Sequence, residues 1–200
     1  GVCQWFGVHC TPKRVTNPTT GVKKLITQYE SNEPPVAIHM RQNHIMGSVP
    51  REFKAMENLK FIDLSGNRLS GILPEYIGKI NQLEYLHLAN NNLGGALPAD
   101  IGFLIGMRHL DLQHNGFTGP IPTEIGRLYN LQNLELNHNK LTGAIPDMAL
   151  SKNLTVIHLE NNELHESFPF SLALQHSLKE IYIQNNGIKG TIPGEIESIR

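Results

Sequence analysis

Histidine and carboxylate side chains recur at regular intervals in the middle of this chain. Both groups can bind metal ions, and histidine also gains and loses a proton near neutral pH. Asp111 and Glu135 are 24 residues apart, and so are His114 and His138. The whole cluster comprises His87, His109, Asp111, His114, Glu135, His138 and His158. Two kinds of chemistry follow from these residue types, a zinc site and a carboxylate pair like that of a retaining glycosidase.

The elements that carry this cluster belong to one phrase, which is repeated seven times between Asn43 and Pro193. Its clearest copy, from Leu110 to Gly126, reads LDLQHNGFTGPIPTEIG. Each copy holds an asparagine, with a period of 24 and one step of 23, and a proline seven places later. The asparagines are Asn43, Asn67, Asn91, Asn115, Asn139, Asn162 and Asn186. This period and phrase predict an α/β repeat solenoid of leucine-rich repeats, a right-handed superhelix with a parallel concave β-sheet.

Aliphatic residues alternate with other residues in part of each copy, which predicts a short strand there. Leu110 and Leu112 are two positions apart, so both point inward while their neighbours point out. Equivalent strands then pair in parallel about 4.8 Å apart and form the concave sheet. We expect the asparagine amides to form a ladder that satisfies turn backbone, because an amide both donates and accepts. A glycine four places later allows positive φ, and a single-turn helix is expected after the proline.

Neither kind of catalytic or metal chemistry is favoured on such a sheet. Zinc needs three or four groups that converge tetrahedrally, whereas side chains on a flat sheet diverge. Asp111 and Glu135 would lie at strand spacing, yet no cleft is predicted to separate their roles. No other catalytic motif is found. We therefore expect no enzyme activity, no metal and no cofactor, and we interpret the cluster as a polar binding surface.

Outward positions on the strands are the candidate binding surface. Phe61, Tyr85 and His109 occupy one column and are predicted to form an aromatic strip. Aromatic rings that stand out of a sheet into water are the usual anchors of binding hot spots. The alternative is that Phe61 and Tyr85 only cover each other as a cross-strand pair. The predicted contact residues are Phe61, Tyr85, His87, His109, Asp111, His114, Glu135 and His138.

Two motifs in this sequence resemble a known family. Asn115 to Gly126 is similar to the repeat of plant-type extracellular leucine-rich repeats, and Cys3 to Cys10 is similar to their N-terminal cap. The resemblance covers residues 1–10 and 36–200 and departs at a long insert after the cap. The family includes receptor-like kinase ectodomains and polygalacturonase-inhibiting proteins. The resemblance implies a second short sheet from the Gly-x-Ile-Pro segments, a superhelical twist, and ligand binding on the concave sheet.

The domain organisation follows from these motifs. Residues 1–35 are predicted to be an N-terminal cap with an insert, and residues 36–200 to be seven repeats that continue or are capped further on. Cys3 and Cys10 are the only cysteines, and their spacing favours a disulfide over two reduced thiols. The repeat between Asn139 and Asn162 lacks one residue, which predicts a deformation of the outer face.

Composition and short motifs bear on location and partners. The net charge of −1 gives no reason to expect nucleic acid, and no apolar run reaches the length of a membrane span. A membrane is expected only through a segment beyond residue 200. Asn153-Leu-Thr155 is an N-glycosylation sequon, which with the disulfide predicts an extracellular or cell-surface location through the secretory pathway.

The predicted function is non-catalytic recognition of a protein, peptide or glycan ligand on the concave face, within a receptor-like ectodomain. Alternative functions are a secreted inhibitor of a cell-wall-degrading glycosidase, similar to polygalacturonase inhibitors, and a structural or adhesive surface protein. The histidines further suggest pH-dependent binding, in which they change charge near pH 5 to 6 while Asp111 and Glu135 stay ionised.

Overall fold

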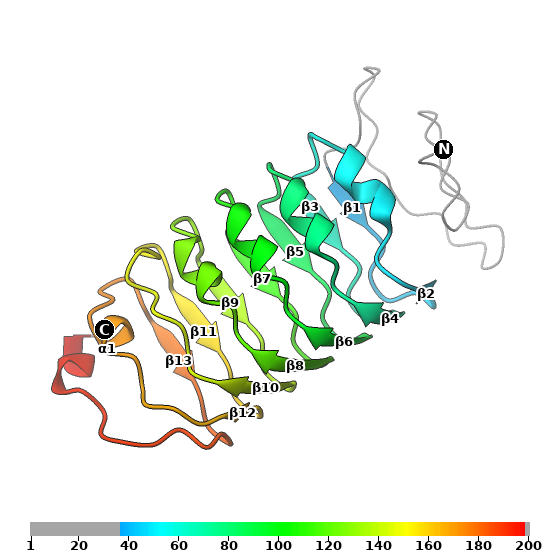
Figure 1. The fold of residues 1–200 in the computed structure, drawn as a ribbon. Coiled ribbons are helices and arrows are strands. Elements are labelled where there is room, and N and C mark those ends of the chain that lie inside the picture. Colours follow the sequence, from blue (N-terminus) through cyan, green and yellow to red (C-terminus); the bar gives the residue numbers. More distant parts are fainter. Residues whose placement is uncertain (1–36, 199–200) are drawn as a thin grey trace.

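A computed structural model describes residues 37–198 of the chain. The predicted cap at residues 1–35, with Cys3 and Cys10, lies outside the described residues. In the described part, each repeat forms one coil of a solenoid, and most coils have a strand on either side and a short helix between them (Figure 1). Residues 37–198 hold no helix that is long and apolar enough to cross a membrane.

The concave sheet has seven parallel strands, one from each repeat, paired in chain order. The strands are β1 (Ala37–His39), β3 (Phe61–Asp63), β5 (Tyr85–His87), β7 (His109–Asp111), β9 (Asn133–Glu135), β11 (Val156–His158) and β13 (Glu180–Tyr182). Equivalent residues lie abreast, so Phe61 pairs with Tyr85 and Tyr85 with His109. The predicted register of the outward columns is therefore confirmed.

A second parallel sheet of six strands lies on the other side of the coils (Figure 1). Its strands are β2 (Met46–Gly47), β4 (Arg68–Ile72), β6 (Asn92–Ala96), β8 (Gly116–Pro120), β10 (Lys140–Gly143) and β12 (Glu163–Leu164). The longer strands begin directly after the ladder asparagine. They therefore start a few residues earlier than the Gly-x-Ile-Pro segments from which the resemblance implied them.

Short helices follow the repeat prolines. They are η1 (Arg51–Ala55), η2 (Glu75–Lys79), η3 (Ala99–Phe103), η4 (Thr123–Arg127), α1 (Phe170–Ala173) and η5 (Gly194–Ser198). Pro98, for example, lies at the N-cap of η3 with φ −73° and ψ 136°. Its ring fixes φ and its missing N–H removes a donor that the first turn could not use. The predicted single-turn helices are confirmed at these six positions.

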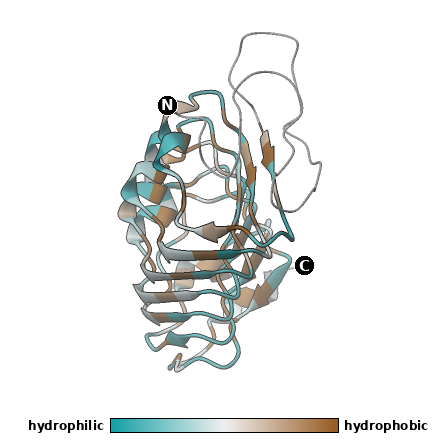
Figure 2. Cartoon of the chain, turned by 90° about the vertical axis from the view of Figure 1, so that its right-hand side faces the viewer, coloured by the Kyte–Doolittle hydropathy of each residue, from teal (hydrophilic) through white to brown (hydrophobic). Residues whose placement is uncertain are grey.

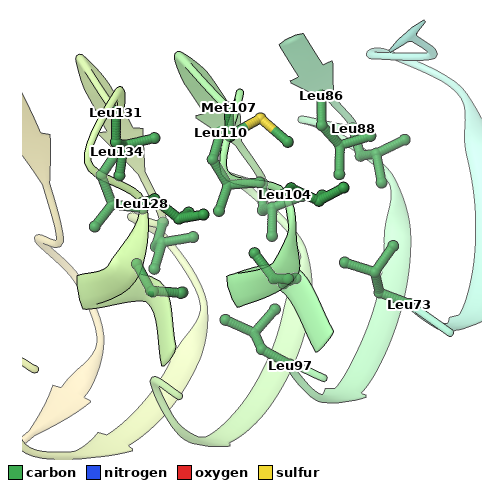
Figure 3. Packing of buried hydrophobic residues seen from close by; sticks show 14 of the residues in the cluster. Leu73, Leu86, Leu88, Leu97, Leu104, Met107, Leu110, Leu128, Leu131 and Leu134 are labelled. Atoms are coloured by element: carbon green, nitrogen blue, oxygen red, sulfur yellow. The ribbon is translucent and has the colours of Figure 1, made fainter. Parts of the chain in front are cut away.

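The hydrophobic core is one continuous column inside the coils. Leu86, Leu88, Leu110 and Leu134 point from the concave strands toward Leu104 and other helix-side residues (Figure 3). Hydrophobic and hydrophilic residues alternate along the coils, as Figure 2 shows. Each fully buried leucine stabilises the fold by roughly 1.5–3 kcal/mol. Because every coil contributes the same inward positions, the outward face keeps a constant geometry over the middle repeats.

The ladder asparagines join each turn to the preceding repeat. Asn91 donates from Nδ2 to the carbonyl oxygens of Leu88 at 2.9 Å and Leu64 at 3.1 Å. Its Oδ1 accepts from the backbone N–H of Leu69 at 3.0 Å. Asn67, Asn115, Asn139, Asn162 and Asn186 repeat this pattern, and Asn43 donates to Met40 and Arg41. The asparagines therefore bridge backbone of two coils and do not bond one another.

One repeat departs from the pattern where the residue is missing. After Pro146 the chain forms no helix, and Asp147 accepts a hydrogen bond from the Ala149 N–H at 2.9 Å. Side chains of the next repeat hold this segment: Ser171 accepts from the Met148 N–H at 3.2 Å, and Gln175 donates to its carbonyl at 2.8 Å. The predicted deformation thus lies on the helix side of the coil, and the concave sheet continues past it without a break.

Candidate functional site on the concave sheet

The aromatic strip of Phe61, Tyr85 and His109 forms a continuous line of rings across β3, β5 and β7. Ring centroids are 5.4 Å apart between Phe61 and Tyr85, and 4.9 Å between Tyr85 and His109. His87 lies beside the strip, 5.5 Å from Phe61 and 6.3 Å from His109. All four side chains are half-buried, because neighbouring rings cover part of each one and leave the rest accessible to solvent. The strip therefore offers a ligand a wide apolar surface.

Asp111 and Glu135 are register partners on β7 and β9. Burial and the nearby negative charge of Glu135 raise the pKa of Asp111 from 3.8 to about 6. Its Oδ1 accepts from the Gln113 N–H at 3.2 Å, and Gln113 donates from Nε2 to Glu135 at 3.0 Å. The expectation that Asp111 stays ionised at pH 5 to 6 is wrong, since desolvation on the sheet favours its neutral form in that range.

Three histidines on this face hold their protons less tightly than free histidine. Burial lowers the pKa of His87, of His109 and of His114, and the positive charge of His138 adds to the effect at His114. These three rings are therefore neutral at pH 7 and act as hydrogen-bonding and stacking surfaces. Their charging falls at a lower pH than an isolated histidine would show.

His114 and His138 do not lie on strands but on the turn that follows each one. Both have left-handed backbone, with φ of 51° and 55°. Their rings stack at 4.0 Å with an interplanar angle of 11°. His138 Nε2 is 3.2 Å from Asn161 Nδ2, and Asn185 donates to Asn161 at 2.8 Å. The same left-handed conformation recurs at the equivalent positions Gln42, Asn90, Asn161 and Asn185, so it belongs to the turn of the repeat.

Several neighbouring residues join the site that sequence reasoning did not single out. The ring of His39 lies 4.4 Å from Phe61 and extends the strip onto β1. Asn137 is buried at 5% exposure, and its Oδ1 has no donor, nor does the buried Oε2 of Glu160. The signal was present in the sequence, because these residues occupy outward columns. Their burial could not be predicted without the neighbouring strands.

Of the two kinds of chemistry that the cluster could perform, only metal binding can be judged from the placement of the described residues. Within residues 37–198, no group of three or more histidine, cysteine, aspartate or glutamate side chains is placed to hold a metal ion. A groove of about 830 Å³ lies on the helix side, at the deformed repeat, between Ile145, Asp147, Pro169 and Phe170. None of the predicted concave contact residues lines that groove.

Asn153 lies on the rim, away from the concave columns. Its side chain is exposed, and Nδ2 donates to the carbonyl oxygen of Tyr129 at 3.1 Å. Thr155 of the same sequon donates to the Gln132 carbonyl oxygen at 3.0 Å. The exposed position leaves room for an attached glycan. Glycosylation at Asn153 stays a prediction.

Two parallel sheets and a buried asparagine ladder define a leucine-rich repeat solenoid. Family models described as leucine rich repeat match residues 37–93 and 57–117, and a second set matches residues 130–149 and 177–199. Together these matches cover more than half of the chain. The chain therefore belongs to the leucine-rich repeat family, and its repeats are of the plant-type extracellular class. A search of curated proteins returns no match.

Several solved structures with the same fold come from plant receptor kinases. The chain is similar to the ectodomain of GASSHO1/SCHENGEN3 from Arabidopsis thaliana, at 28% identity and TM-score 0.80, over 84% of this chain and 20% of that one. It is also similar to Pollen Receptor Kinase 3, at 25% identity and TM-score 0.73, over 96% of this chain and 84% of that one. The Arabidopsis receptor kinase HAESA matches at 31% identity and TM-score 0.61, over 79% of this chain and 31% of that one.

Two of these structures are complexes. GASSHO1/SCHENGEN3 was solved with CASPARIAN STRIP INTEGRITY FACTOR 2, and HAESA with the peptide hormone IDA and the co-receptor SERK1. The chain spans a fifth of the length of the first ectodomain and less than a third of the second.

Proposed function

We propose that this chain is a non-catalytic recognition module of a receptor-like ectodomain, which binds a peptide or protein ligand on its concave face outside the cell. The predicted contacts are Phe61, Tyr85, His87, His109, Asp111, His114, Glu135 and His138. Two observations support the proposal: membership of the leucine-rich repeat family, and similarity to ectodomains that were solved with a peptide hormone or another partner.

The aromatic strip is the observation that carries the proposal. A solvated sheet face of this fold needs no aromatic residue for stability, because the inward columns supply the core. Phe61, Tyr85 and His109 nevertheless place three rings in contact along one column. Cross-strand pairing accounts for their contact with one another but leaves their outer edges in water. A ligand that covers these edges would remove that exposed apolar surface from solvent.

Binding to the strip is testable with random-sequence peptides displayed on phage and selected on the purified chain. Calorimetry would then measure the affinity of the selected peptides for Phe61→Ala and Tyr85→Ala, with circular dichroism to verify folding. We expect each substitution to weaken binding by about tenfold or more, since aromatic anchors dominate interfaces. The matched control is Tyr129→Ala, an aromatic ring that is 48% exposed outside the concave columns.

The outcome separates the proposed function from its alternatives. Peptides that bind Tyr85→Ala as tightly as the wild type would contradict recognition by the concave face. Tight binding of a secreted polygalacturonase, with loss of its activity, would instead support the inhibitor function. Absence of any peptide or protein ligand would favour a structural or adhesive role.

A further inference from the structure

The concave face carries more negative charge than the chain as a whole. Counted from each strand to the residue before the ladder asparagine, its outward positions hold five carboxylates and one guanidinium, a formal charge of −4 with neutral histidines. These are Asp63, Asp111, Glu135, Glu160, Glu180 and Arg41. The net charge of all 200 residues is only −1. Negative charge is therefore concentrated on the face where a ligand is expected.

Three of these carboxylates, which we call the carboxylate triplet, come from three successive strands beyond the aromatic strip. Asp111 on β7 and Glu135 on β9 are register partners, and Glu160 follows His158, the register partner of Glu135 on β11, by two residues. In the described part of the chain, the lysine and arginine ion pairs are those of Glu84 with Lys60 and Arg108. No lysine or arginine among residues 37–198 thus neutralises the triplet. Like charges on adjacent strands repel each other, so a positively charged group bound at the triplet would relieve this repulsion.

Hydrogen bonding at the triplet is incomplete as well. Asn137 lies between Gln113 and Glu160 in its column, and its Oδ1 and the Glu160 Oε2 are both buried without a donor. Gln113 donates to Glu135, and no donor of the described chain reaches the other two oxygens. A buried acceptor without a partner is unfavourable. The Nε2 of His158, the register partner of Glu135, is also buried without a hydrogen bond and can supply one donor at most. Unpaired acceptors therefore outnumber donors here, which is the pattern that an ammonium or guanidinium group complements.

We propose that the carboxylate triplet and Asn137 bind a lysine or arginine side chain of a peptide ligand whose apolar residues cover the aromatic strip. This inference rests on the proposed function and specifies the chemistry of its ligand. Tyr85 and Glu135 are on strands separated by two strand spacings, roughly 10 Å. An extended peptide spans about 3.3 Å per residue, so the basic residue lies about three to five residues from the apolar one.

The same displayed peptides test this inference. We expect the selected sequences to carry lysine or arginine about three to five residues from an aromatic or aliphatic residue. Glu135→Gln should weaken their binding about tenfold, since it removes a charge-assisted hydrogen bond but keeps the shape and the acceptor for Gln113. The matched control is Glu163→Gln, which removes one carboxylate from the second sheet and should leave affinity unchanged.

A double-mutant cycle connects the two groups directly. Replacing the peptide's basic residue by glutamine should weaken binding to the wild type about tenfold and have little effect on Glu135→Gln. Equal losses in both backgrounds would overturn the inference. So would selected peptides that need Tyr85 yet show no preference for lysine or arginine, an outcome that leaves the proposed function intact. Failure to select any peptide would contradict both the proposed function and this inference.

Discussion

At the scale of single residues, Asn139 shows how one side chain secures two coils. Its amide donates to the carbonyl oxygens of Leu136 and Leu112, and its oxygen accepts from the Phe117 N–H. Asn139→Ala leaves these buried groups without partners, so we expect a loss of roughly 3 kcal/mol in the free energy of unfolding, measured by urea denaturation. Asn92→Ala, an exposed neighbour of the ladder, should change it by less than about 0.5 kcal/mol. Similar losses in both variants would contradict a special role for the ladder.

The carboxyl group of Asp111 makes a second residue-scale prediction, about pH. Its pKa is raised to about 6 in the folded state, so the folded protein binds more protons than the unfolded chain between about pH 4 and pH 6. The contribution of Asp111 to stability is therefore fully present below about pH 4 and is lost as the pH rises through about 6.

Asp111→Asn removes this penalty and keeps an acceptor for the Gln113 N–H. We expect the variant to be more stable than the wild type at pH 7, on the order of 2 kcal/mol, with no difference at pH 4. Chemical denaturation at the two pH values measures this difference in the free energy of unfolding. The lowered pKa values of His87 and His109 act in the opposite direction, since stability from these rings is lost as pH falls below 6.5. They are common to both proteins and cancel in the difference, so an equal gain at pH 4 would disprove the assignment to Asp111.

At the scale of elements, the short helices pack so closely that some positions admit no side chain. A Cβ atom added to Gly102, in η3, would lie 2.5 Å from the Cβ of Glu124 in η4. Gly102→Ala should therefore force the helices apart and cost about 1–3 kcal/mol in thermal unfolding. Gly106 has ordinary room, with its nearest atom at 3.8 Å, so Gly106→Ala should be close to neutral. A neutral Gly102→Ala would show that the repeats can shift apart freely.

The elements also show how far the sequence could predict the fold. Period alone predicted the concave strands, their register, the asparagine ladder and the helices after the prolines, because each depends on residues within one repeat or on its identical neighbour. The loss of the helix after Pro146 depends on one missing residue and on Ser171 and Gln175 of the next coil. The burial of Asn137 and the raised pKa of Asp111 depend on side chains from adjacent strands, which spacing does not reveal.

At the scale of the whole molecule, packing is uneven along the array. Leu110 and Leu112 of the middle repeats are fully buried, whereas Ile181 and Ile183 near the end of the described region are only partly buried. Each coil is stabilised mainly by its neighbours, so local opening should be easiest where burial is least. In a polypeptide of residues 1–200, we expect the amides of β13 to exchange with deuterium at least about tenfold faster than those of β7. The amides of β9 serve as the control and should match β7; uniform exchange across all three would contradict this gradient.

The two sheets differ in how successive strands are offset. On the concave side, paired residues such as Phe61 and Tyr85 are 24 positions apart, whereas on the other side Ser70 pairs with Asn92, 22 positions on. Equivalent points on the second sheet thus slide by two residues, roughly 6–7 Å, with each coil. Because the offset is present on one side of the coils and absent on the other, we expect the array to have a superhelical twist. On a twisted sheet, an extended peptide cannot stay over one outward column for many strands and must cross to the next column. A path from the aromatic strip to Glu135 and Glu160 crosses columns in this way. The twist of the array, as well as the side chains on it, therefore limits the length of a bound peptide and the spacing of its contact residues.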